Sequence, residues 1–267
     1  MRLFRDALVA LLASLCFVAN PTSAASFSTD QSDLYYIAKE SGWGMQLVQR
    51  GDTIFATLFV YGQSTAPTWF VATLLPSGQF MWSGDLYATT GPWFATVPFD
   101  TALVTGTKVG TMTWDGSLVN SGTVTYTVNG IQVVKDVIRQ SLVNENYSGH
   151  FAGGVHQVNT GCSVPANNGT REQAGIVDIF QSGTAMTINT SSSGGSGCAY
   201  TGSLTQYGQM GQLVGTFACS DGSVGGFAAI EMQVTEFSVS GRFNASYVLP
   251  AGCQATGWFG GVAVTTF

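Results

Sequence analysis

The two histidines of the chain, His150 and His156, are the first residues to consider for catalysis. They lie six residues apart, so both would project from the same face of a β-strand. A zinc site needs a third ligand, and no neighbouring residue completes such a set. No Gly-x-Ser-x-Gly segment marks a serine nucleophile. We therefore predict two ordinary strand or surface histidines and no metal, cofactor or catalytic residue, while a serine hydrolase that uses either histidine as its base stays open.

Carboxylates could act in pairs, as in glycoside hydrolases, where one carboxyl group is the acid and the other the base or nucleophile. Asp178 is the most interesting, because it shares a strand face with Ile176 and Phe180. Burial without a partner would raise the pKa of its carboxyl group. We favour instead an aspartate at a strand edge, or one hydrogen-bonded inside a barrel. The other candidates are Glu40, Asp52, Asp85 and Glu231.

The tryptophans suggest binding rather than catalysis. Planar aromatic side chains on a β domain can stack on sugars or line the mouth of a barrel that takes a small apolar ligand. The alternative is that they fill the core of the domain, and this suits Trp43 best, because glycines flank it. Within residues 43–94, the candidate ligand-binding residues are Trp43, Trp69, Trp82, Trp93 and Phe94, together with Glu40 just before them.

Four cysteines lie in the C-terminal half, at Cys162, Cys198, Cys219 and Cys253. An even number in an exported chain predicts two disulfides, with three pairings open. We expect Cys162 to pair with Cys198 and Cys219 with Cys253, since each bond would then join neighbouring strands or their loops. The restriction of these cysteines to one half also indicates two separate folding units.

The first 25 residues have the three parts of a secretory signal peptide. Arg2 and Arg5 form a basic start, residues 7–19 are an apolar run, and small residues at Ala24 and Ala25 suit cleavage. The run is too short for a permanent anchor, and no later stretch reaches the roughly 20 apolar residues of a transmembrane helix. We therefore expect a secreted or periplasmic protein.

The charge balance excludes one class of partner. Without the leader, 7 basic and 14 acidic residues remain. The basic residues are few and do not cluster, so there is no positive surface for binding nucleic acid by counterion release. Because 45% of all residues are hydrophobic, the chain has ample material for a packed core despite its low charge.

Strand patterns punctuated by turn residues recur after the leader, and helical periodicity is absent. Residues 122–128 alternate threonine with Val or Tyr, and Asn129-Gly130 then separates them from a second strand at 131–138. An Asn-Gly pair favours the two-residue hairpin turn with positive φ. Residues 53–61 and 68–75 are apolar on both faces, which predicts strands covered on two sides.

These patterns predict an all-β fold of two consecutive antiparallel β-barrel or β-sandwich units, the second pinned by disulfides. After a signal peptide at 1–25, we assign the first unit to 26–143 and the second to 144–267. About seven strands are expected between residues 43 and 139, and about eight between 147 and 264.

Several short segments of the N-terminal half form a distinctive set. They are Glu40-Ser-Gly-Trp-Gly44, a Phe-Ala-Thr segment at 55–57, Pro67-Thr-Trp69 and a Thr-Thr-Gly-Pro segment at 89–92. With them, residues 40–140 resemble a widespread family of exported proteobacterial proteins that open with the same Glu-Ser-Gly-Trp-Gly sequence. The resemblance implies a bacterial, exported β domain. It brings no established activity and no functional residues, and the cysteine-bearing half lies outside it.

The leading hypothesis is an exported, non-catalytic β module that binds a small apolar ligand or a glycan, or that serves the cell envelope or extracellular matrix. Its basis is the aromatic-rich β domain, the acidic charge and the lack of an assembled catalytic set. A carbohydrate-active hydrolase is the first alternative. An outer-membrane β-barrel is the second, favoured by the leader and the terminal Phe267, but strands that are apolar on both faces do not fit its polar lumen.

Overall fold

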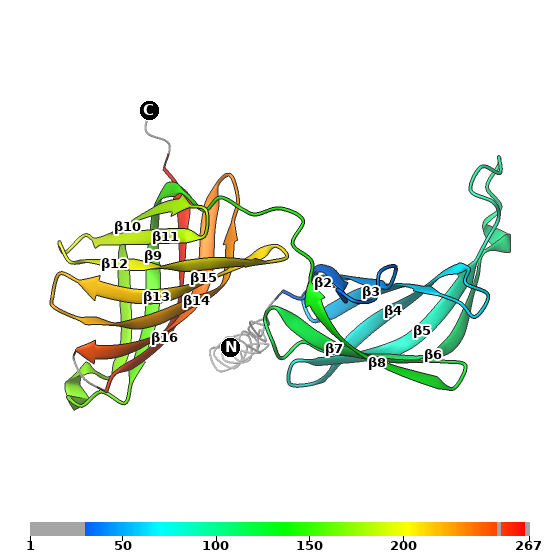
Figure 1. Ribbon diagram of the computed structural model, residues 1–267, viewed down its shortest axis with the longest axis horizontal. Helices are drawn as coiled ribbons and strands as arrows, with labels where there is room; N and C mark the ends of the chain where they lie inside the picture. The colour runs from blue at the N-terminus through cyan, green and yellow to red at the C-terminus, as the bar shows by residue number, and fades with distance from the viewer. Residues whose placement is uncertain (1–29, 250–251, 265–267) are drawn as a thin grey trace, which may run out of the picture.

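The computed structural model describes residues 30–249 and 252–264, and it contains two closed antiparallel barrels of eight strands each. The barrels follow one another in the sequence, the C-terminal one at the left of Figure 1 and the N-terminal one at the right. The predicted all-β fold with two units is therefore confirmed, and both units are barrels. The predicted signal peptide lies outside the described residues.

The strands are long and joined mostly by short turns. The N-terminal barrel contains β1 (Asp33–Tyr36), β2 (Gly44–Arg50), β3 (Thr53–Tyr61), β4 (Pro67–Gly78), β5 (Met81–Thr90), β6 (Thr105–Asp115), β7 (Ser121–Val128) and β8 (Ile131–Arg139). The C-terminal barrel contains β9 (Gly149–Thr160), β10 (Gly169–Ser182), β11 (Ala185–Ser192), β12 (Gly197–Tyr207), β13 (Met210–Cys219), β14 (Val224–Val234), β15 (Ser238–Leu249) and β16 (Gln254–Ala263). Residues 140–148 join the two barrels, and the boundary expected at 143/144 falls within them.

Each strand pairs with its neighbours in sequence, and the first and last strands of each barrel close the circle. The hairpin predicted at residues 122–138 is confirmed as β7 and β8, with Val128 opposite Ile131. Asn129 and Gly130 have φ values of 50° and 81°, which are the positive values that this turn requires. The expected seven strands of the N-terminal half are eight, because the four-residue β1 precedes the segment where strands were expected.

The core of each barrel is its interior. Side chains alternate along β2, so that Met45 and Leu47 are buried while Gln46 and Val48 are exposed. Two separate apolar clusters result, one inside each barrel. No helix in the described part of the chain is long and apolar enough to span a bilayer.

Glycines let paired strands of the barrels approach one another more closely than a side chain would allow. A Cβ at Gly175 of β10 would lie 1.9 Å from the carbonyl oxygen of Ser191 on β11. A Cβ at Gly110 of β6 would lie equally close, 1.9 Å, to that of Thr127 on β7. Only glycine permits such an approach, and such positions are typical of the bends of small barrels.

The expectation that residues 53–61 and 68–75 are covered on both faces is wrong. Their inward residues, such as Leu58 and Leu74, are fully buried. Their outward residues Phe55, Phe59 and Trp69 are between 43% and 57% exposed on the wall of the barrel. A closed barrel covers only the inner face of a strand, so these apolar outward side chains remain partly exposed to solvent.

The expected disulfide pairing is also wrong, although the bonds do lie in the C-terminal unit. Cys198 pairs with Cys219, directly opposite it on neighbouring strands. Cys162 pairs with Cys253, which is 91 residues away in the sequence. Closure of the barrel places β9 beside β16. Cys162, which follows β9, and Cys253, which precedes β16, therefore become neighbours.

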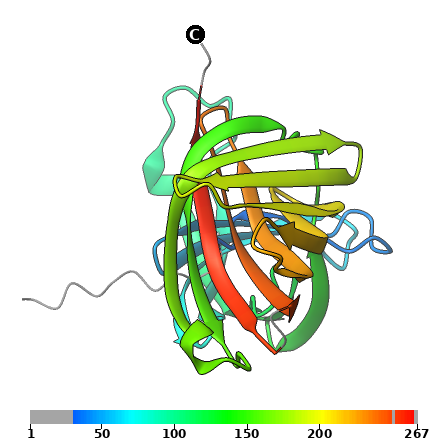
Figure 2. The ribbon, with the colours of Figure 1, turned by 90° about the vertical axis from the view of Figure 1, so that its left-hand side faces the viewer.

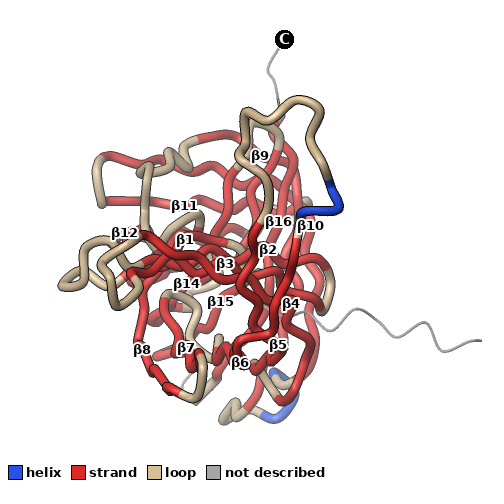
Figure 3. Tube along the Cα trace, turned by 90° about the vertical axis from the view of Figure 1, so that its right-hand side faces the viewer, coloured by secondary structure: helices blue, strands red, loops and turns tan. Residues whose placement is uncertain are grey.

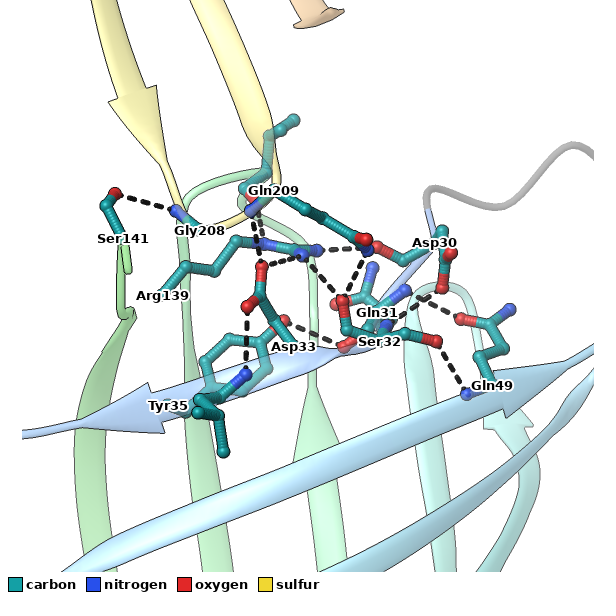
Figure 4. Close-up of polar contacts among 12 residues, drawn as sticks. Asp30, Gln31, Ser32, Asp33, Tyr35, Gln49, Arg139, Ser141, Gly208 and Gln209 are labelled. Atoms are coloured by element: carbon teal, nitrogen blue, oxygen red, sulfur yellow. Dashed lines mark hydrogen bonds and ion pairs between the residues drawn. The ribbon is translucent and has the colours of Figure 1, made fainter. Parts of the chain in front are cut away.

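The two barrels contact one another through polar groups at facing ends (Figure 4). The turn between β12 and β13 reaches the start of β1. There the Gln209 backbone N–H donates to Asp33 Oδ2 at 3.0 Å, and the Gln209 side-chain amide donates to the Ser32 carbonyl at 2.7 Å. Ser141, just after β8, donates to the Gln206 carbonyl and accepts from the Gly208 N–H, both at 3.0 Å. Beside these contacts, the Arg139 guanidinium pairs with Asp33 at 3.1 Å.

Candidate functional site

The middle of the C-terminal barrel contains a small apolar pocket. It has a volume of about 50 Å³, and inward side chains from seven of the eight strands surround it. Almost all of its lining is aliphatic or aromatic: Val155, Val177, Ile188, Thr190, Tyr200, Phe227, Ala229, Phe243 and Phe259. Such a lining would bind an apolar group and would offer a charged group almost no hydrogen-bonding partners.

Tyr147 lies fully buried at the end of the barrel that faces the N-terminal unit. Its hydroxyl donates to the Met232 carbonyl at 2.9 Å, and a Cβ at Gly211 would touch that hydroxyl. Burial raises the pKa of Tyr147 to about 12, so the phenol stays neutral. This tyrosine and the core around it fill the inner end of the barrel, which leaves the opposite end as the route to the pocket.

The opposite end is a polar mouth of about 160 Å³, which shares Val155 and Tyr200 with the apolar pocket. Gln157 donates from its amide to the Tyr247 hydroxyl at 3.0 Å. The mouth therefore offers hydrogen-bonding groups directly above an apolar floor. Its polar lining consists of Gln157, Asn159, Asn167, Arg171, Gln173, Asp221, Ser223 and Tyr247.

Both disulfides brace this mouth, which lies at the end of the C-terminal barrel that faces the viewer in Figure 2. Cys162–Cys253 joins the loop after β9 to the start of β16, and Cys198–Cys219 joins the start of β12 to the end of β13. Three of the four cysteines line the mouth itself. Strand ends and loops are ordinarily the most mobile parts of a barrel, so these crosslinks hold the lining residues in place.

One positive and one negative side chain contribute to the mouth. The Ser223 backbone N–H donates to Asp221 Oδ1 at 2.9 Å and lowers the pKa of that carboxyl group, and the charge of Arg171 acts in the same direction. Tyr200 stays neutral, because burial raises its pKa to about 12. The opposite charges of Arg171 and Asp221 favour an uncharged or zwitterionic polar group over a strongly charged one.

Asp221 is the only carboxylate among the described residues that line the mouth and the apolar pocket. A glycosidase mechanism needs two carboxyl groups about 5 to 10 Å apart, so these residues do not supply the pair. Asp178 lies on the outer wall, where it is partly exposed and pairs with His150. Its carboxyl group is thus neither buried without a partner nor inside the barrel.

His150 and His156 both lie on the outer wall of β9, and each pairs with a carboxylate of β10. The partner of His156 is Glu172, and the imidazole also stacks on Trp258 with 3.8 Å between ring centroids and 12° between planes. Over residues 30–249 and 252–264, no group of three His, Cys, Asp or Glu side chains could hold a metal ion.

The candidate residues of the N-terminal half do not form one site. Trp82 is buried in the core, where its indole N–H donates to the Asp52 carbonyl at 3.1 Å. Trp43 packs partly buried against the same core and donates to the Tyr126 hydroxyl at 3.3 Å. Glu40 pairs with Lys135 at 2.6 Å on the surface. Core packing accounts for both tryptophans.

Trp69, Trp93 and Phe94 are the exposed members of that set. Trp69 lies on the outer wall of β4 and donates to the Thr89 hydroxyl at 3.0 Å. Trp93 and Phe94 lie on the loop between β5 and β6, with 5.4 Å between their ring centroids. None of the three lines the apolar pocket or the mouth of the C-terminal barrel.

Tryptophan content does not indicate the pocket or the mouth, because no tryptophan among the described residues lines either of them. A usable signal was present in β9, where Gln157 and Asn159 have the same strand phase as the buried Phe151 and the pocket-lining Val155. Polar residues that follow apolar ones in the inward phase indicate the open end of a barrel.

Neither a protein-family model nor a curated protein sequence matches this chain. The resemblance of residues 40–140 to the exported Glu-Ser-Gly-Trp-Gly proteins therefore stays an expectation.

Proposed function

We propose that this protein is an exported binding protein whose C-terminal barrel holds a small amphiphile. The observation that carries the proposal is the apolar pocket that lies directly beneath a polar mouth braced by disulfides. An apolar group would enter the pocket between Tyr200 and Phe243, and a polar group would stay in the mouth near Gln157. Sites of this kind combine an apolar lining with a few polar groups that fix orientation.

The size of the pocket limits the ligand. A space of about 50 Å³ is smaller than the roughly 150 Å³ cavity that takes a benzene ring, so the apolar part has a few carbon atoms. The mouth, at about 160 Å³, is large enough for a polar head such as a single sugar ring or a similar hydrogen-bonding group. A ligand with a short apolar chain and a sugar-like head combines features of both ligands expected from the sequence, a small apolar molecule and a glycan.

The two disulfides support the proposed setting. Such crosslinks form and persist outside the cytoplasm, in oxidising compartments, which agrees with an exported protein. They also support a binding role, because a preorganised mouth loses less conformational entropy when the ligand arrives.

The distribution of side chains argues against the outer-membrane alternative. The interiors of both barrels are packed with apolar residues, whereas transmembrane barrels have a polar interior. The outer wall of the C-terminal barrel carries the two carboxylate–histidine pairs and the Arg242–Glu231 pair. Charged side chains in such positions are costly in a lipid environment.

The test is a titration with alkyl β-D-glucosides of increasing chain length, from methyl to octyl, by isothermal calorimetry. Each methylene that enters the pocket should increase the affinity about fourfold, and the increase should stop when the pocket is full. Val155→Phe places a ring where the pocket meets the mouth and should weaken the binding of butyl glucoside at least tenfold.

Val214→Phe is the matched control, because Val214 lies on the outer wall of the same barrel and is 52% exposed. It makes the same chemical change outside the pocket and should leave the affinity unchanged. The proposal is wrong if none of the glucosides binds, if affinity is independent of chain length, or if both phenylalanine variants bind like the wild type.

A further inference from the structure

The loop between β5 and β6 lies at the end of the N-terminal barrel that is remote from the other unit (Figures 1 and 3), and several of its apolar side chains are exposed to solvent. We call residues 91–104 the tip. Phe94 is 87% exposed and Val97 is 92% exposed, among the highest values of the described apolar residues. The exposed apolar side chains of the tip are Trp93, Phe94, Val97, Phe99, Leu103 and Val104.

Several backbone N–H groups of the tip form hydrogen bonds with acceptors within the tip itself. Asp100 caps the short helix η1 (Thr101–Leu103) and accepts from the Ala102 N–H at 2.9 Å. The Val104 N–H donates to the Thr101 carbonyl at 3.2 Å, and the Thr96 N–H donates to the Trp93 carbonyl at 2.9 Å. Internal bonds of this kind reduce the cost of moving a backbone out of water.

Charge is nearly absent from this part of the chain. Between Asp85 of β5 and Lys108 of β6, which pair with one another at 2.7 Å, Asp100 is the only charged residue. Within the tip, the remaining polar side chains are those of Thr96 and Thr101. A tip without basic residues, on an acidic protein, would gain nothing from an anionic surface.

We propose that the tip inserts into the interfacial region of a lipid bilayer of zwitterionic composition. Tryptophan and phenylalanine are the side chains that partition best into this region, and Asp100 limits the depth because a carboxylate resists entry into hydrocarbon. Tyr61 and Trp69, exposed at the ends of β3 and β4 on the same side of the barrel, would then lie at the level of the headgroups. The proposal is independent of the ligand site in the other barrel.

The small extent of the tip favours lipid over a second copy of the chain. A stable protein interface uses about 20 to 30 residues on each side, and the tip offers six exposed apolar side chains on one narrow loop. Apart from Asp100, the tip also lacks the charged and amide groups that form the polar rim of such interfaces. Insertion into lipid needs only apolar area.

The test is flotation of the full-length mature protein with phosphatidylcholine vesicles. Phe94→Ser should lower the partition coefficient about tenfold or more, because it removes the most exposed aromatic ring of the tip. Phe237→Ser is the matched control, since Phe237 is a 71% exposed phenylalanine in the turn between β14 and β15 of the other barrel. It should leave partition unchanged.

Several outcomes would overturn the proposal. These are the absence of binding to phosphatidylcholine, binding that requires anionic lipid, and equal effects of the two serine variants. Sedimentation velocity provides a separate measurement in the absence of vesicles. Self-association that Phe94→Ser abolishes, without vesicle binding by the wild type, would identify a second copy as the occupant.

Discussion

Arg139 is the one charged residue that is buried in the part of the chain described by the structure. Four oxygen atoms surround its guanidinium group. Nε donates to the Val119 carbonyl at 2.7 Å, Nη2 to the Asp30 carbonyl at 2.6 Å, and Nη1 to both the Ser32 carbonyl and the Asp33 carboxylate. A planar fork with five donors can bind all these groups at once, and the guanidinium thereby fastens the start of β1 to the end of β8.

Arg139→Ala should lower the free energy of unfolding of the N-terminal barrel by about 3 to 5 kcal/mol, because Asp33 and three carbonyl groups lose the buried guanidinium as a donor. Urea denaturation followed by tryptophan fluorescence reports this barrel, which contains five of the six tryptophans. Arg50→Ala, at an exposed position at the end of β2, should change the value by no more than about 0.5 kcal/mol. Equal effects of the two variants would contradict the proposed role of Arg139.

The aromatic residues show how far residue types alone can predict a site. Trp69, Trp93 and Phe94 are exposed, and Trp82 is buried, yet the sequence presents them as one group. Strand phase separates them only when the bounds of the strands are known: Trp82 faces inward on β5 and Trp69 faces outward on β4. The pocket was missed for the related reason that its lining comes one or two residues at a time from seven strands.

At the scale of elements, hairpins with a strong turn signal could be predicted and short or sharply bent strands could not. Asn129-Gly130 fixes the turn between β7 and β8 through the φ values that these residues tolerate. The four residues of β1 have no such signal, and Arg139 and closure against β8 hold them in place. The apolar outward residues of β3 and β4 suggested a covered sheet, because sequence patterns do not show whether a second layer exists.

The close approach of β10 to β11 at Gly175 gives a test of how the strands of the C-terminal barrel pack. Gly175→Ala should destabilise this barrel by about 1 to 3 kcal/mol, because the new methyl group would force β10 away from β11. Gly106→Ala, in β6, places its Cβ in open space and should be neutral or slightly stabilising. Differential scanning calorimetry should show a lower transition temperature only for the first variant, and an unchanged temperature would show that β10 and β11 can accommodate a methyl group there.

Considered as a whole, the molecule has its two proposed binding regions at opposite extremes, with the polar contact between barrels in the middle (Figure 1). The mouth of the C-terminal barrel and the tip of the N-terminal barrel both lie away from that contact. Such whole-molecule features were beyond prediction from the sequence. The Cys162–Cys253 bond, for example, depends on the closure of β9 against β16, and the contact at Gln209 joins residues about 176 positions apart.

Gly208 tests whether the contact fixes the barrels relative to one another. It has φ +58° in the turn between β12 and β13, and a Cβ there would lie 1.9 Å from the Asp33 carboxylate. Gly183, in the turn between β10 and β11, has nearly the same φ, +60°, and open space around it. Alanine at either position should cost about 1 to 2 kcal/mol of stability, because a left-handed backbone disfavours a side chain.

Only Gly208→Ala should also separate the barrels, since its methyl group displaces Asp33 from the Gln209 N–H. Small-angle X-ray scattering should then give a larger radius of gyration, and NMR relaxation should show the two barrels tumbling independently. Gly183→Ala should keep the dimensions of the wild type. If Gly208→Ala also kept them, the polar contact would follow from the short linker at 140–148 rather than fix the arrangement of the two barrels.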